Sequence, residues 1–248
     1  MKTFEALFFD LGGTLIFFDG DWPEVYTKAN NTVVEHLKNA GLDLEFDAFM
    51  NDFLSRLNHY YNERESELIE HTTTHILRTT LADWDYSEVT QDLVDSTMKS
   101  MYAVSQAHWI PEVDAHEMLR IFQEQGYRLA IISNAADDND VQTLVDNANI
   151  RSYFDLILSS AAVGIRKPNP RIFEIALEMM DVPNSRVAMV GDTLGADILG
   201  AQNADIYSIW ITRRADNPSN LAHAKTIEAD MEIATLEELP RRLMMIKK

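Results

Sequence analysis

The regular alternation of two kinds of segment after residue 110 constrains the fold more than any other feature of this sequence. Short apolar segments alternate there with longer segments whose apolar residues recur at helical spacing. This alternation predicts a parallel sheet that is covered by helices on both faces. The predicted strands are residues 127–133, 154–159, 186–190, 206–211 and, more weakly, 231–233, and the predicted helices are residues 113–125, 140–148, 170–180, 195–203 and 236–245.

Residues 6–10 form another short apolar segment, which is far from the alternating region in sequence. A single strand needs partners, so we expect it to join the same sheet. Residues 16–23 have the composition of a linker, and helical periodicity dominates the residues that follow. We therefore predict an α/β fold with a three-layer Rossmann-like parallel sheet core, residues 1–16 and 109–248, and an inserted four-helix cap domain, residues 17–108. The four predicted helices are residues 23–41, 46–62, 66–81 and 87–107.

The end of the first apolar segment carries a carboxylate and two glycines. Asp10 follows a run suited to a buried strand, and Gly12 and Gly13 let the chain turn sharply and let a ligand approach the backbone. Open α/β sheets bind ligands at the carboxyl ends of their strands, where Asp10 would lie. Taken alone, a strand followed by an Asp-Gly turn without any chemistry explains this stretch equally well.

Polar residues also follow three later predicted strands, and in a parallel sheet these strand ends share one edge with Asp10. Each group has a simpler explanation as a turn or as the start of a helix. Lys167 is the exception, because Asn169 and Pro170 can begin the next helix without it. The groups are Ser133 with Asn134, Lys167, and Asp192 with Asp197.

The convergence of these groups predicts a site for a metal ion and a phosphate. Asp10 and Asp192 offer the hard oxygen ligands that Mg²⁺ takes, while water and phosphate occupy its other positions. The net charge of −19 argues against nucleic acid or an anionic membrane as a partner, because both would be repelled. A phosphate site in such a chain needs a local cation, which Lys167 supplies.

Composition limits the remaining possibilities. The 248 residues suffice for one or two domains, and the absence of cysteine excludes disulfides, a thiolate zinc site and a thiol nucleophile. The first residues lack the pattern of a signal peptide, and no segment is long and apolar enough to span a bilayer. We therefore expect a cytoplasmic protein.

Taken together, these motifs resemble those of the haloacid dehalogenase-like hydrolase superfamily, in the branch with a helical cap inserted after the first motif. Four motifs occur in order and cover nearly the whole chain. They are Asp10 to Thr14, Ser133, Lys167 with residues 168–170, and Gly191 with Asp192 to Asp197.

The resemblance implies a Mg²⁺-dependent hydrolase that acts on a small phosphorylated metabolite. Asp10 would attack phosphorus to form an aspartyl-phosphate, which water then hydrolyses. Lys167 would offset the anionic cluster and stabilise the transferring group, and Asp197 would hold Lys167 or a metal-bound water. The implied Mg²⁺ ligands are Asp10, Asp192 and the backbone carbonyl of Gly12, and the implied substrate-binding residues are Ser133, Asn134 and Thr14.

The chain departs from the phosphatases of this superfamily at Gly12, where they usually carry a second aspartate as general acid and base. General acid-base catalysis contributes about 10²- to 10⁴-fold, so poor leaving groups are expected to react slowly. Three explanations for the missing aspartate remain open. Another acid such as Asp19 or Asp21 replaces the missing group, or the substrate needs no acid, or the protein binds a phosphorylated ligand without effective catalysis.

Two other activities of the superfamily are less favoured. Its dehalogenases usually carry an aromatic residue in place of Gly12 and lack the metal-binding aspartate, whereas this chain retains Asp192. Its phosphonoacetaldehyde hydrolases need a lysine in the cap, and Lys28, Lys38 and Lys99 lie in no recognisable motif. Substrate specificity is expected to come from the cap, whose most suggestive residues are His59, Tyr60, Tyr61, His71 and His75.

Overall fold

The computed structural model describes residues 3–246, so the first two and last two residues of the predicted core lie outside it. Its centre is a parallel sheet of six strands in the order β5-β4-β1-β6-β7-β8. β1 lies inside the sheet, between β4 and β6, which confirms that the first apolar segment joins the later strands. The strands are β1 (Ala6–Phe9), β4 (Arg128–Ser133), β5 (Leu156–Ser159), β6 (Val187–Gly191), β7 (Tyr207–Ile211) and β8 (Met231–Ile233).

Helices cover both faces of this sheet and confirm the predicted α/β class. Leu7 and Phe9 of β1 pack on one face with residues of α5, α6 and α11, whereas Ala6 and Phe8 pack on the other with residues of α8 and α9. Strands buried on both faces need continuous apolar sequences rather than alternating ones. The helices are α5 (Ala115–Glu124), α6 (Asp138–Asn147), α7 (Ser160–Val163), α8 (Pro170–Met180), α9 (Leu199–Asn203), α10 (Pro218–His223) and α11 (Leu239–Met245), with short turns η1 (Arg151–Tyr153), η2 (Asn184–Arg186), η3 (Leu194–Ile198) and η4 (Leu236–Glu238).

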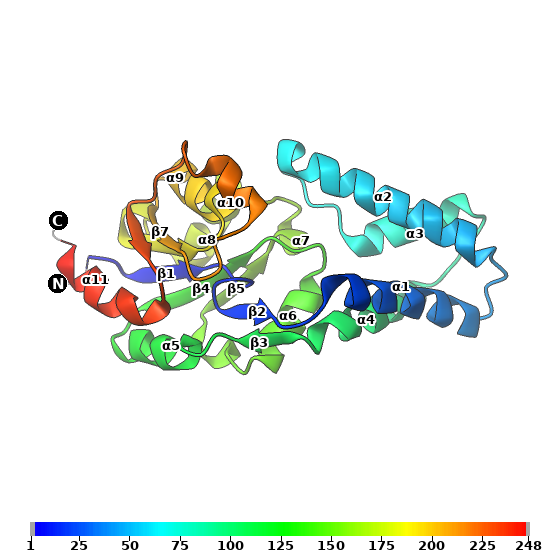
Figure 1. Cartoon of the computed structure of the whole chain (residues 1–248), viewed down its shortest axis with the longest axis horizontal. Helices are drawn as coiled ribbons and strands as arrows, with labels where there is room; N and C mark the ends of the chain where they lie inside the picture. Colours follow the sequence, from blue (N-terminus) through cyan, green and yellow to red (C-terminus); the bar gives the residue numbers. More distant parts are fainter. Residues whose placement is uncertain (1–2, 247–248) are drawn as a thin grey trace.

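Four helices lie beyond the carboxyl ends of the strands, on the side away from both chain ends (Figure 1). We call them the helical unit. They share a core of their own, in which Leu37, Phe53, Leu81 and Met98 are buried. Each helix begins where a side chain accepts a hydrogen bond from a first-turn backbone N–H. Their bounds are α1 (Trp22–Asn39), α2 (Phe46–Glu67), α3 (Thr73–Asp83) and α4 (Gln91–Gln106).

The predicted start of the third helix at residue 66 is wrong. α2 continues to Glu67, and Leu68 then takes a left-handed conformation with φ 56° that ends it. The chain does not become helical again until Thr73. Residues 68–72 instead leave the helical unit and contact the loop that precedes Lys167, a long-range contact without a local sequence signal.

The predicted linker over residues 16–23 is also wrong in its first part. β2 (Ile16–Phe18) pairs with β3 (Trp109–Pro111) to form a separate antiparallel ribbon. The rings of Phe18 and Trp22 stack with centroids 3.9 Å apart, and Trp109 meets both edge-on. This ribbon carries the chain into and out of the helical unit. Its strands are about ninety residues apart in sequence, so local patterns could not reveal the pairing.

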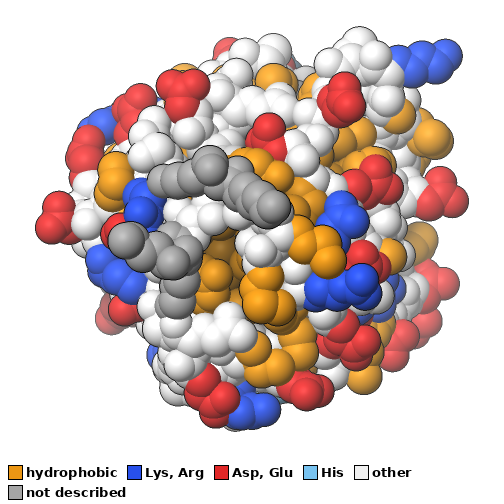
Figure 2. All heavy atoms as spheres, turned by 90° about the vertical axis from the view of Figure 1, so that its left-hand side faces the viewer, with side chains coloured by type: hydrophobic (Ala, Val, Ile, Leu, Met, Phe, Trp, Pro, Cys, Tyr) orange, Lys and Arg blue, Asp and Glu red, His pale blue; other side chains and the backbone are white. Residues whose placement is uncertain are grey.

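The amino-terminal ends of the strands form the opposite face of the molecule. Figure 2 looks onto this face and shows hydrophobic side chains between scattered acidic and basic ones. Asp10, Asp192 and Asp197 are buried at the other end of the strands. Within residues 3–246, none of the helices is both long and apolar enough to cross a membrane.

A buried ion pair joins the helical unit to the loop before Lys167. Ile69 and Ile165 form an isolated antiparallel bridge, and the Glu70 carboxylate next to it is buried. Arg166 belongs to the core and donates to Glu70. The positive charge of Arg166 therefore neutralises the negative charge of Glu70. The donors to this carboxylate are Arg166 Nη1, Tyr60 Oη and Ser160 Oγ, the last at 2.6 Å.

We predict that Arg166→Met lowers the free energy of unfolding by about 3 kcal/mol, because it leaves the buried Glu70 charge without its cation. Denaturant titration followed by circular dichroism measures the loss, and Glu70→Gln added to Arg166→Met recovers part of it. The control is Arg171→Met, which removes an exposed arginine paired with Glu174 and Glu178 and changes little. Equal stabilities for the Arg166 and Arg171 variants would contradict the expected role of the buried pair.

Candidate active site

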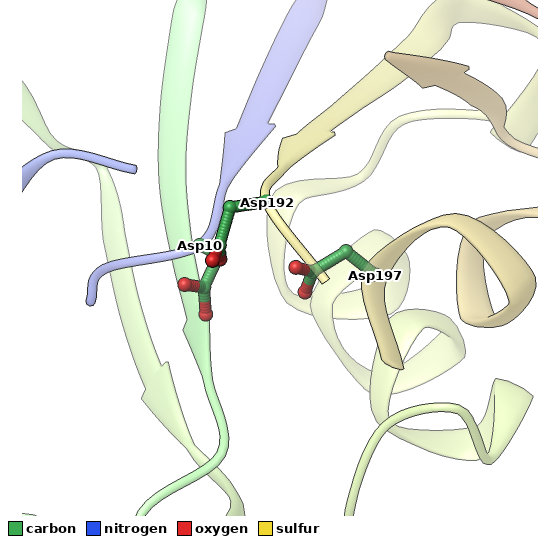
Figure 3. Close-up of side chains that lie close together, drawn as sticks. All are labelled: Asp10, Asp192 and Asp197. Atoms are coloured by element: carbon green, nitrogen blue, oxygen red, sulfur yellow. The ribbon is translucent and has the colours of Figure 1, made fainter. Parts of the chain in front are cut away.

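Three acidic residues of the predicted site meet at the carboxyl edge of the sheet. Asp10 follows β1, Asp192 follows β6, and Asp197 lies in η3. Each offers one carboxylate oxygen, and these three oxygens lie within 4.8 Å of one another. Figure 3 shows the three side chains close together, with the Asp197 carboxylate turned toward Asp10 and Asp192. The convergence that was expected from strand ends is therefore present in the fold.

Lys167 connects this carboxylate cluster to the sheet. Its Nζ donates to Asp10 Oδ1 at 2.7 Å, to Asp197 Oδ1 at 2.6 Å and to the carbonyl oxygen of Ile132 at 2.6 Å. Its side chain is only 1% exposed. The Asn134 side chain bonds to both the backbone N–H and the carbonyl of Lys167. Asn134 therefore positions the lysine backbone, a role that the motif alone did not indicate.

Close approach to Asp192 explains the glycine at residue 13, three positions after Asp10. Gly13 has φ +85°, and a Cβ built there would come within 2.6 Å of Asp192 Oδ2. Any side chain at residue 13 would therefore push Asp192 away from Asp10 in addition to straining the backbone. The second glycine of the motif keeps the two carboxylates together.

Asn220 and Trp210 order the loop that carries Asp192, and sequence analysis missed both. The buried Asn220 side chain donates to the carbonyl oxygen of Asp192 at 2.8 Å and accepts from Leu194 N at 2.7 Å. Trp210 Nε1 donates to the same carbonyl at 2.9 Å. The one available signal was an asparagine within an otherwise unassigned segment, which is too weak to indicate this role.

The charges of the cluster are unbalanced, because three carboxylates share one ammonium. Burial, together with the charges of Asp10 and Asp197, raises the pKa of Asp192 to about 8. Burial also raises the pKa of Asp10 to about 6, and the Lys167 ammonium counteracts part of that rise. The cluster therefore favours an additional positive charge, and its oxygen donors are those that Mg²⁺ prefers.

A cavity of about 440 Å³ lies between this edge and the helical unit. Its size suits a small ligand. The predicted residues that line it are Asp10, Gly12, Ser133, Asn134, Lys167 and Asp197, and the residues that sequence analysis did not assign to the site include Arg64, Tyr102, Trp109, Asp140 and Arg166.

Thr14 is the predicted substrate-binding residue that does not line the cavity. It is fully buried, and its Oγ1 has no hydrogen-bond partner within residues 3–246. Asp19 and Asp21 do not line the cavity either. Both are exposed, and Asp21 caps α1 by accepting from Glu24 N. The linker acids thus lie outside the site where the missing proton donor would act.

Most of the suggestive residues of the helical unit also lie elsewhere. His59, His71 and His75 line a separate hollow, and Tyr60 binds Glu70. Tyr61 does line the main cavity. A Schiff-base mechanism would require a lysine of the helical unit in this cavity. The described residues that line the cavity include none of the three candidates, Lys28, Lys38 and Lys99.

Trp109 occupies the space beside Gly12. A Cβ built on Gly12 would lie 3.3 Å from two atoms of the indole ring, Cζ3 and Cη2. The ribbon β2–β3 thus places a large aromatic side chain where an aspartate at residue 12 would begin. Gly12 and Trp109 form one packed pair, so the missing carboxylate is linked to the position of the ribbon.

Asp140, in the first turn of α6, is an acid of the cavity that sequence analysis did not identify. Its Oδ1 accepts from Gln106 Nε2 of α4 at 2.8 Å. Burial raises its pKa to about 6, with the neighbouring Asp137 adding to the rise. Asp140 therefore holds a proton more readily than an exposed aspartate does.

Comparison with known proteins identifies the family of this chain. A family model described as haloacid dehalogenase-like hydrolase matches residues 4–205. The chain is 23% identical to the glyceraldehyde 3-phosphate phosphatase of Pyrococcus furiosus over all of this chain and 95% of that protein. It is 30% identical to the glyceraldehyde 3-phosphate phosphatase of Methanothermobacter thermautotrophicus over 84% of this chain and 85% of that one.

Solved structures share the fold. A 2-haloacid dehalogenase from Pseudomonas syringae pv. Tomato superposes with a TM-score of 0.66 at 22% identity, over 97% of this chain and 98% of that one. A HAD phosphatase from Thermococcus onnurineus superposes with a TM-score of 0.61 at 21% identity, over 96% and 97%. With its motif residues gathered at one sheet edge and the family model spanning most of its length, the chain belongs to the haloacid dehalogenase-like hydrolases.

Proposed function

We propose that this protein is a Mg²⁺-dependent phosphatase of a small phosphorylated metabolite and that Asp10 is its nucleophile. The observation that carries the proposal is the buried Lys167 ammonium, which bonds Asp10 and Asp197 at the wall of the 440 Å³ cavity. An ammonium fixed beside a carboxylate nucleophile suits a substrate that brings its own negative charge. The names of two full-length relatives, both glyceraldehyde 3-phosphate phosphatases, point the same way.

In the proposed reaction, an Asp10 carboxylate oxygen forms a bond to phosphorus while the ester P–O bond breaks. The leaving group departs with that bond's electrons, and water later cleaves the aspartyl-phosphate to release phosphate and restore Asp10. Lys167 holds Asp10 Oδ1 in place and balances charge on the transferring group. Ser133 lines the cavity, where its hydroxyl would donate to a phosphoryl oxygen.

The residues fit the metal that this chemistry requires. Asp10, Asp192 and the backbone carbonyl of Gly12 would hold Mg²⁺, which supplies charge neutralisation and orientation of the phosphoryl group. The raised pKa of Asp192 supports this assignment, because a cation would offset both the burial and the charges of Asp10 and Asp197 that raise it. Retention of Asp192 also favours phosphoryl transfer over dehalogenation.

We expect Asp10→Asn to lower the hydrolysis of 4-nitrophenyl phosphate with Mg²⁺ by about 10³-fold or more, because the amide is not a nucleophile. A phosphate-release assay measures the loss, and circular dichroism verifies that the variant folds. Asp21→Asn, which changes an exposed acid outside the cavity, serves as the matched control and retains activity. Activity that persists in Asp10→Asn would exclude Asp10 as the nucleophile, and an inactive wild-type protein that still binds phosphate would favour the binding-module alternative.

Mg²⁺ should raise the melting temperature of the wild-type protein, because a ligand that binds only the folded state stabilises it. Asp192→Asn removes a proposed ligand, so the shift on adding MgCl₂ should largely disappear in this variant. Asp140→Asn changes a cavity acid outside the carboxylate cluster and should retain the shift. Differential scanning calorimetry with and without a chelator measures all three proteins, and an undiminished shift in Asp192→Asn would exclude Asp192 as a ligand.

Restoring the acid at residue 12 should require space as well as a carboxylate. We expect Gly12→Asp combined with Trp109→Leu to raise turnover of glycerol 3-phosphate, a poor leaving group, by about 10²-fold or more relative to 4-nitrophenyl phosphate. Gly12→Asp alone should gain less, since its Cβ meets the indole ring. Trp109→Leu alone is the control without the acid. A double variant with no gain would show that the proton is supplied elsewhere or is not needed.

A further inference from the structure

We infer that the substrate carries a second anionic group, a carboxylate or another phosphate, and that Arg64 of α2 binds it. This inference rests on the proposed function, because it places the two groups of one ligand at two ends of the same cavity. Arg64 belongs to the helical unit, whereas Asp10 and Lys167 belong to the sheet edge, and all three residues line the cavity.

Three cations line the cavity, and two of them already have buried acidic partners. Arg166 pairs with Glu70, and Lys167 pairs with Asp10 and Asp197. Arg64 forms no ion pair with any side chain that the structure describes. A chain with 40 acidic and 21 basic residues has ample carboxylates to neutralise an arginine. One unpaired arginine in this cavity is therefore available for an anion from outside the chain.

The Arg64 side chain is held in place, but one of its hydrogen-bond donors has no acceptor among the described side chains. Its guanidinium lies over the Tyr61 ring, with Cζ 4.7 Å from the ring centroid. Its Nε is buried and has no hydrogen-bond partner among the side chains that the structure describes. A buried donor without a partner is unfavourable, so an acceptor that reaches it is bound favourably. Stacking on the ring fixes the planar fork, which suits the two oxygens of a carboxylate or phosphate.

The remaining lining suits the body of such a ligand. Tyr61, Tyr102 and Trp109 line the cavity together with its charged residues. A volume of about 440 Å³ accommodates a small metabolite with its phosphate at Ser133 and Lys167 and a second anion at Arg64. The inferred substrate class is therefore that of small phosphate esters with two anionic groups, rather than neutral sugars or alcohols with one.

The test compares two ligands that differ only in the second group. Glycerate 3-phosphate carries a carboxylate where glycerol 3-phosphate carries a neutral hydroxymethyl group. Both are measured as competitive inhibitors of 4-nitrophenyl phosphate hydrolysis, and propane-1,3-diyl bisphosphate forms a third arm that distinguishes a second phosphate from a carboxylate. In the wild-type protein, at least one of the two ligands with a second anionic group should inhibit about tenfold to a hundredfold more strongly than glycerol 3-phosphate.

Arg64→Met should remove this preference and leave inhibition by glycerol 3-phosphate within about twofold, because only the second anion loses its partner. Arg64→Lys keeps the positive charge but lacks the planar guanidinium, so this variant should retain part of the preference for a second anionic group. Arg78→Met is the matched control, since Arg78 is an exposed arginine of the same unit that bonds Gln91 outside the cavity. A wild-type protein without the preference, or an unchanged preference in Arg64→Met, would overturn the inference.

The same comparison can be made without turnover. Calorimetric binding of the three ligands to the Asp10→Asn variant, with and without Arg64→Met, measures the preference in a protein that cannot react. Loss of the preference on Arg64→Met there supports the inference even if the proposed catalysis fails. Hydrolysis of 4-nitrophenyl phosphate that depends on Asp10, combined with a preference insensitive to Arg64, would overturn the inference and leave the proposed function standing.

Discussion

The site depends on one buried ammonium. Lys167 is nearly inaccessible to water, and such a charge is tolerated in a protein interior only where acceptors surround it. Its three acceptors come from the ends of β1 and β4 and from η3, which follows β6. These three strands are neighbours in the sheet. A single side chain therefore ties together the strand ends on which the carboxylates are mounted, and the excess negative charge that remains makes the cluster receptive to a cation.

The residue before this lysine ties the helical unit to the same loop. Arg166 pairs with the buried Glu70, so consecutive cations face two different parts of the molecule. Asn134 holds the backbone of Lys167 from the neighbouring strand end. Displacement of residues 68–72 would therefore expose a buried charge next to the lysine. The helical unit and the carboxylate cluster are thus connected through two adjacent residues.

The cavity combines side chains from both parts of the chain. The sheet edge supplies Asp10, Asp197, Lys167 and Ser133. The helical unit supplies Tyr61, Arg64 and Tyr102. Trp109 of the connecting ribbon fills the space next to Gly12. The absence of a carboxylate at residue 12 is thus a packing feature as well as a chemical one. In the proposed function, different parts of the fold carry out the chemistry at phosphorus and select the ligand.

Much of the fold could be predicted because it follows from local periodicity. The helix Pro170–Met180 and the strand Met231–Ile233 have the predicted bounds, and the other strands of the sheet differ by one or two residues at an end. Asp10, Lys167, Asp192 and Asp197 could be brought together in advance, because the carboxyl ends of parallel strands meet at one edge whatever the intervening sequence. The sequence by itself thus determined the sheet, the helices around it and the carboxylate cluster with its lysine.

Only the tertiary structure decided the contacts between segments distant in sequence. The pairing of Ile16–Phe18 with Trp109–Pro111 joins residues about ninety positions apart, and the docking of residues 68–72 next to Arg166 is equally non-local. The roles of Arg64, Asp140 and Asn220 depend on how their helices are rotated against the sheet, which periodicity does not specify. Local chemistry sets the elements and their motifs, whereas packing between elements decides which further side chains reach the cavity.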